Sequence, residues 1–128
     1  MPELAFRDGV MDRIRLRESR YDEQAYLFVL SALEHSQAQL AARRHISAPE
    51  LAQSCRQLAL ERYGVMARLV LERWGVRATA DFGEIVFTLI DLGFLVKQAN
   101  DSREEFLEVF DFERVFERDY PWNSAHYA

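Results

Sequence analysis

The chain of 128 residues carries a net charge of −5, is 49% hydrophobic and 29% charged, and has the size of one ordinary domain. This composition is too apolar for a disordered chain and too charged for a membrane protein. No apolar run reaches the ~20 residues that cross a bilayer, and the opening MPELAFRDGV lacks the basic and then hydrophobic pattern of a signal peptide, so we expect a cytoplasmic location.

The first elements predicted along the chain are two helices of different strength. Residues 1–20 predict a marginal helix, because apolar residues share one side while Gly9 and dense charge weaken it. Apolar residues recur at helical spacing from Asp22 to about Ala42 and predict the first long helix. The next residues, Arg43 to Ile46, favour a short extended segment.

A capping pattern predicts the start of the second long helix. Ser47 and Glu50 have the spacing of a capping box, and Pro49 is tolerated in the first turn, where no N–H partner is lost. We expect this helix to run to about Tyr63 and to end at Gly64, which adopts left-handed conformations easily.

Two further helices follow in the sequence. The third is expected from roughly Val65 to Trp74, before Gly75 stops it. The fourth lies in TADFGEIVFTLIDLGFL, where Asp81 and Glu84 repeat the capping-box spacing. Its apolar residues point in most directions, which predicts a helix buried on most sides and ended by Gly93.

A β-hairpin is predicted after the fourth helix. Phe94–Gln98 and Glu105–Phe112 are rich in aromatic and branched residues, and a turn-forming stretch separates them. The alternation of the second segment suits a ribbon that packs one face on the helices. A last short helix is expected over Phe112–Arg118, and residues 119–128 are expected to be a flexible tail.

These elements predict a mainly α fold with a small β-hairpin, an α+β arrangement in one domain of residues 1–128 with its core at 21–118. Their order resembles the winged-helix architecture, in which the hairpin would be the wing. LIDLGFLVK carries the resemblance best, because such domains often end the last core helix with apolar residues around Gly and turn into the first wing strand.

At whole-sequence level the chain resembles an uncharacterised bacterial family found mainly in planctomycetes and verrucomicrobia. The words that carry this resemblance are RYDEQAYLFVLSALEHS, RRHISAPEL, LALERYGVMARLVLERWGV, DFGEIVFTLIDLGFLVK and DSREEFLEVFDF. The similarity runs from about Arg20 to Phe116. It implies no known activity and transfers no functional residue.

The residue types that carry catalysis do not form a recognisable pattern. Cys55 lies on the apolar side of its predicted helix, which favours a buried structural thiol over a reactive one. His35 and His45 match no zinc spacing, and no phosphate-binding, dinucleotide, nucleophile-elbow or zinc-protease motif is present. We therefore expect no enzyme activity, no cofactor and no bound metal.

Charge is distributed unevenly along the sequence. Residues 1–80 carry 12 basic and 10 acidic side chains, whereas residues 81–128 carry 4 and 11. A DNA-reading winged helix would place cations before and on its wing, yet residues 78–96 contain no Lys or Arg. The charged residues of the predicted hairpin are mostly acidic, so the hairpin would repel a phosphate backbone.

A basic region remains at residues 43–77, with seven Arg against three Glu. Three interpretations stay open: a solvated flank that the anionic C-terminal half neutralises, a site for an acidic protein, and a site for RNA or DNA. The candidate partner-binding residues are Arg43, Arg44, Arg56, Arg68 and Arg73.

The sequence thus predicts a non-catalytic protein–protein interaction module with an unidentified partner and no membrane attachment. The alternative is a nucleic-acid-binding regulatory protein, for RNA or DNA, that uses the arginine-rich region 43–77. A homo-oligomer is also open, because the two differently charged halves of the chain can pair across a twofold axis.

Overall fold

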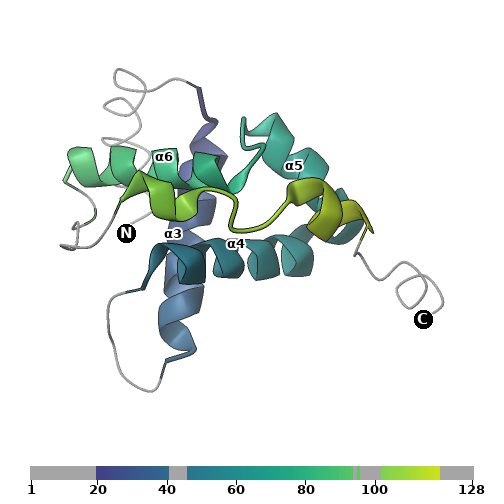
Figure 1. Cartoon of the computed structure of the whole chain (residues 1–128), viewed down its shortest axis with the longest axis horizontal. Helices are drawn as coiled ribbons and strands as arrows, with labels where there is room; N and C mark the ends of the chain where they lie inside the picture. The colour runs from purple at the N-terminus through teal and green to yellow at the C-terminus, as the bar shows by residue number, and fades with distance from the viewer. Residues whose placement is uncertain (1–19, 41–45, 94, 96–101, 119–128) are drawn as a thin grey trace.

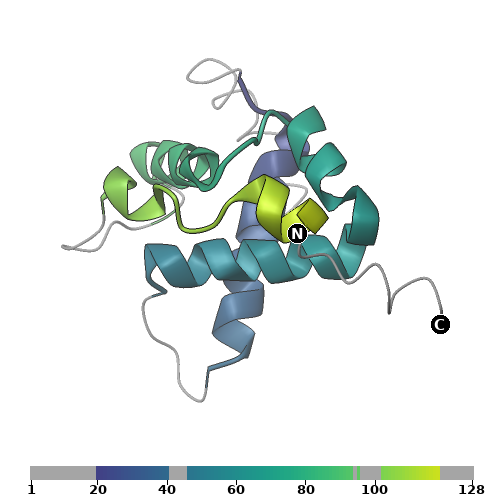
Figure 2. The same ribbon diagram turned by 45° about the vertical axis from the view of Figure 1, so that its right-hand side comes forward.

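The computed structural model describes residues 20–40, 46–93, 95 and 102–118, and these are mainly helical. The elements are α3 (Glu23–Ala38), α4 (Ala48–Tyr63), the 3-10 turn η2 (Gly64–Met66), α5 (Ala67–Arg73), α6 (Thr79–Asp91), the 3-10 turn η3 (Arg103–Phe106) and the short π-helix η4 (Arg114–Arg118). α3 crosses α4, and residues 102–118 lie over both α6 and α4 (Figures 1 and 2). No helix in these ranges is long and apolar enough to cross a membrane.

Several predicted elements fall outside the described residues. These are nearly all of the marginal helix at 1–20, most of the extended segment Arg43–Ile46, all but Leu95 of the first hairpin strand, and the tail 119–128. The candidate partner-binding residues Arg43 and Arg44 also lie outside the described residues.

The first two long helices begin where the sequence predicts. Asp22 caps α3 by accepting a hydrogen bond from the backbone N–H of Gln24 at 2.8 Å, although the helix ends at Ala38, before the predicted Ala42. The capping box of α4 is confirmed: Ser47 Oγ accepts from the Glu50 N–H at 3.3 Å, and Glu50 Oε1 accepts from the Ser47 N–H at 3.0 Å.

The direction of α5 is fixed by a corner of aromatic rings. The sequences at the ends of α4 and α5 are similar, LERYG and LERWG. The rings of Tyr63 and Trp74 in these two segments contact each other, with 5.7 Å between their centroids. Both rings also pack on Phe28 of α3. Gly64 and Gly75 both have positive φ, 53° and 93°, as expected of residues that end helices.

α6 is the central buried helix, and it starts earlier than the predicted cap at Asp81. Its first residue is Thr79, and Asp81 acts from inside the first turn by accepting from the N–H groups of Arg77 at 2.8 Å and Ala78 at 3.2 Å. A carboxylate is favourable at either position near a helix start, so spacing alone did not decide between them. Burial on most sides and termination at Gly93, with φ 87°, are confirmed.

The prediction of a strand at Glu105–Phe112 is wrong, and no strand occurs in the part of the chain that the structure describes. The Leu107 N–H donates to the Glu104 carbonyl at 3.1 Å, which is the bond of a 3-10 turn and not of a strand ladder. The rings of Phe110, Phe112 and Phe116 pack on one another, and the Phe112 ring also packs on Phe82 of α6. The short helix predicted at Phe112–Arg118 is confirmed, with a π-helical turn.

Candidate functional site

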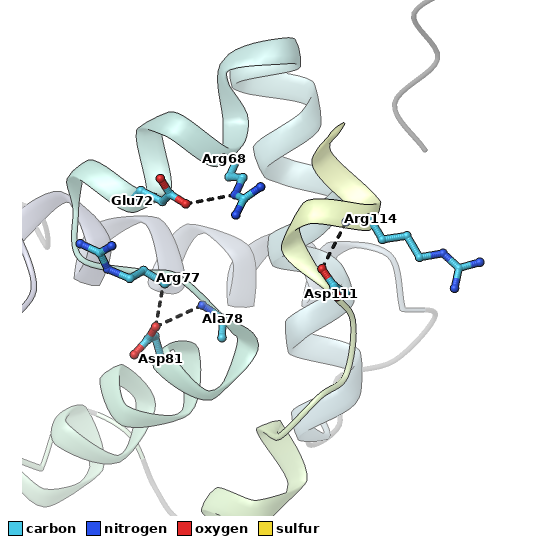
Figure 3. Close-up of polar contacts among 7 residues, drawn as sticks. All are labelled: Arg68, Glu72, Arg77, Ala78, Asp81, Asp111 and Arg114. Atoms are coloured by element: carbon cyan, nitrogen blue, oxygen red, sulfur yellow. Dashed lines mark hydrogen bonds and ion pairs between the residues drawn. The ribbon is translucent and has the colours of Figure 1, made fainter. Parts of the chain in front are cut away.

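A groove of about 570 Å³ opens between α5, the start of α6 and residues 107–113 (Figure 3). Arg68 of α5 lies on one side of it, and Leu107 and Phe110 provide apolar surface on the other. We call the exposed carboxylates of Glu108, Asp111 and Glu113, which also line the groove, the acidic rim. The groove therefore combines apolar surface with an excess of negative charge.

A buried threonine holds the wall that carries this rim. Thr79, 1% exposed, donates from Oγ1 to the Phe106 carbonyl at 2.5 Å and accepts from the Val109 N–H at 3.2 Å. One hydroxyl thus satisfies both backbone groups that flank residues 107 and 108. The turn is fixed to the first residue of α6.

The turn held by Thr79 presents two residues outward. Leu107 is 56% exposed, which is high for a large apolar side chain, and Glu108 has φ +51°. A non-glycine residue in this left-handed region costs about 1 kcal/mol. Such strain persists only where the surrounding contacts impose it, and strained residues cluster at binding and active sites.

Two further contacts fasten the segment before the turn to α6. Phe106 lies directly on Gly83, where an added Cβ would come within 2.9 Å of the Phe106 ring and Cβ atoms. Arg103 Nε forms an ion pair with Glu84 Oε2 at 3.2 Å, and its guanidinium lies 5.0 Å from the centre of the Phe87 ring. The wall of the groove is therefore anchored independently of the rim residues.

The opposite wall already has its charges partly paired. Arg68 Nε contacts Glu72 Oε2 at 3.0 Å, one helical turn along α5 (Figure 3). Asp81 accepts from the Tyr21 hydroxyl at 2.6 Å as well as from the backbone at the α6 start. Burial, followed by this hydrogen bond, raises the pKa of Tyr21 well above its usual range. A carboxylate of the chain itself thus occupies the position where the start of α6 favours an anion.

The predicted arginines do not come together in one place. Arg68 lines the groove, together with Arg77 from the same basic region. Arg73 is exposed at the end of α5. Arg56 lies on α4, where Nη1 donates to Gln53 Oε1 at 3.3 Å and Nε is buried without a hydrogen-bond partner.

Cys55 and His35, which were considered from the sequence for catalysis or metal binding, lie in surroundings typical of structural residues. Cys55 is fully buried, and burial raises the pKa of its thiol well above the usual range, so the nucleophilic thiolate is disfavoured. Nε2 of His35 lies 3.0 Å from Gln39 Nε2 and 3.5 Å from Gln57 Oε1. The described residues contain no cluster of three or more His, Cys, Asp or Glu that could hold a metal ion.

Comparison of the chain with protein-family models, curated proteins and solved structures gave no match. The resemblance to a planctomycete and verrucomicrobial family therefore stays a prediction.

Sequence reasoning missed Leu107, Glu108 and Thr79 as parts of a site. Leu107 and Glu108 were assigned to a strand, and Thr79 is an ordinary helix-start residue by type. The one available signal was the density of acidic residues around Leu107.

Proposed function

We propose that the chain is a non-catalytic protein-interaction module, and that its groove binds a polypeptide segment with apolar and basic side chains. The observation that carries this proposal is the turn held by Thr79, which keeps Leu107 exposed beside three carboxylates at a cost in backbone strain. Adjoining apolar surface, here from Leu107 and Phe110, with a polar rim is typical of protein–protein interaction surfaces.

The chemistry of the groove selects this kind of ligand. Leu107 and Phe110 offer apolar surface for a side chain of the ligand, and the acidic rim favours a neighbouring Lys or Arg. On the other side Arg68 is paired with Glu72, and Arg77 also lines the groove, so the lining carries three carboxylates against two guanidinium groups. A polyphosphate would meet the rim with like charge, which disfavours nucleic acid at this surface.

The winged-helix likeness belongs to the proposal as well. The order of the helices supports it, and residues 102–118 follow α6 in the sequence as a wing does, although they form no strand. In this proposal, the element that takes the place of a DNA-contacting wing is the acidic wall of a protein-binding groove.

Affinity capture from a nuclease-treated lysate tests the function. The full chain is compared with Leu107→Asp and with Glu108→Lys combined with Glu113→Lys, and Glu34→Lys on α3 is the matched control for charge reversal of an exposed glutamate. We expect a protein retained by the unaltered chain and by Glu34→Lys but lost by both groove variants.

Two outcomes contradict the proposal. Retention that vanishes on nuclease treatment would support the nucleic-acid alternative at the arginine-rich region 43–77. If all variants retain the captured protein equally, its binding surface lies elsewhere on the molecule.

A further inference from the structure

A second exposed apolar surface lies on the outer side of η2 and α5. Val65, Met66 and Leu69 are 45%, 49% and 50% exposed, whereas Ala67 and Leu71 face the core. Met66, Leu69 and Arg73 follow one another at spacings of three and four residues, so they share one side of the helix. We call Val65, Met66, Leu69 and Arg73 the α5 ridge.

The α5 ridge has the chemistry that the groove selects. It offers three apolar side chains followed by the guanidinium of Arg73, for which the described residues provide no ion-pair partner. The groove offers Leu107 and Phe110 together with the carboxylates of the acidic rim. Apolar surface thus matches apolar surface, and the cation matches the anions.

The α5 ridge lies beside the groove of its own molecule but does not fill it. α5 borders the groove through Arg68, whereas Leu69 points to solvent and stays half exposed. Ala67 and Leu71 on the other side of α5 are fully buried, so turning the ridge inward would expose them. A ridge can fill a groove only when the two belong to different copies.

We propose that the ligand of the groove is the α5 ridge of a second copy of this chain, so that two copies form a twofold-symmetric dimer. The inference rests on the proposed function and names the partner of the same surface. In a twofold dimer the ridge of each copy meets the groove of the other, so each contact forms twice. Ridge and groove adjoin along α5, which places both in one continuous interface.

Sedimentation velocity over a dilution series of the full chain tests the dimer. We expect concentration-dependent dimers of the unaltered chain and of the Glu34→Lys control. We expect a dissociation constant at least about tenfold higher for Leu69→Glu, for Arg73→Glu, and for Glu108→Lys with Glu113→Lys. Circular dichroism of each variant verifies that its helices are retained.

A mixing experiment isolates the charge complementarity. Arg73→Glu alone and Glu108→Lys with Glu113→Lys alone each place like charges at both contacts of the dimer. In the mixed pair, one contact has its charges exchanged and the other is unaltered, so both are attractive again. We expect the mixture to form heterodimers at concentrations where each variant alone is monomeric.

The outcomes separate this inference from the proposed function. A chain that stays monomeric at millimolar concentration overturns the dimer, and loss of a captured protein from the groove variants would then still support the module. Dimers that resist all three variants, or a mixture that stays monomeric, overturn the ridge–groove contact.

Discussion

α6 and the segment Arg103–Arg118 lie against each other, yet their sequences specify structure in different ways. α6 is apolar on most sides and forms the expected helix within a turn of its predicted start. The segment alternates aromatic and polar residues as a strand does, but its backbone forms η3, a strained turn and η4. The comparison shows that the aromatic residues of an alternating pattern can be buried without a strand, because the pattern leaves the backbone hydrogen bonds undetermined.

The backbone of the segment is decided by three positions on α6. Thr79, Gly83 and Phe87 follow at intervals of four residues and form one line along the helix. Thr79 donates a hydrogen bond to the Phe106 carbonyl, and Gly83 lies under the Phe106 ring. The Phe87 ring packs against the guanidinium of Arg103. Among the described residues, the surface beside this segment is helical and offers no strand for pairing.

The largest effect is expected from Thr79→Val, which keeps the shape of the side chain and removes its hydroxyl. The Phe106 carbonyl and the Val109 N–H then lose their partner, and we expect the free energy of unfolding to fall by about 2–3 kcal/mol. Urea unfolding measures the change. Thr79→Ser keeps the hydroxyl and should retain most of the stability; equal losses for both variants would show that the hydroxyl does not hold the turn.

Gly83→Ala tests the close approach of Phe106 to α6. Alanine favours a helix by ~1 kcal/mol over glycine, but the added Cβ lies 2.9 Å from Phe106, and overpacking costs about 1–3 kcal/mol. We expect a net loss of roughly 1 kcal/mol in the free energy of unfolding. In a Phe106→Ala background the loss should become smaller, because the ring atoms are gone while the Cβ at 2.9 Å remains. An equal loss in both backgrounds on thermal unfolding would contradict the contact with the ring.

The smallest effect is expected from Glu108→Gly, which relieves the left-handed backbone of the turn. We expect the free energy of unfolding to rise by up to about 1 kcal/mol, because glycine adopts φ +51° without strain. Glu104→Gly in η3 is the control and should lower stability through the greater freedom of its unfolded chain. A loss of stability in Glu108→Gly would mean that the turn is not strained.

Much of the helical fold was predictable because its signals are local. The capping box at Ser47 and the glycines at 64, 75 and 93 mark helix ends through contacts within a few residues, and all of them act as expected. The cap of α6 was misplaced by one turn because Asp81 is suitable both before a helix and in its first turn.

The candidate site was not predicted from the sequence. The candidate partner-binding residues were the arginines of residues 43–77, and the acidic residues around Leu107 served only to disfavour DNA. The groove itself depends on Thr79 reaching Phe106 and Val109, which are 27 and 30 residues further along the chain. Contacts at such separations have no periodic signature in a single sequence.

A photo-crosslinking amino acid at position 107, compared with the same group at position 34 on α3, tests the central claim most directly. If the groove is a protein-binding surface, position 107 will give protein adducts that survive nuclease treatment, and position 34 will give far fewer. Adducts at position 107 that disappear with nuclease, or equal adducts at both positions, would contradict the account.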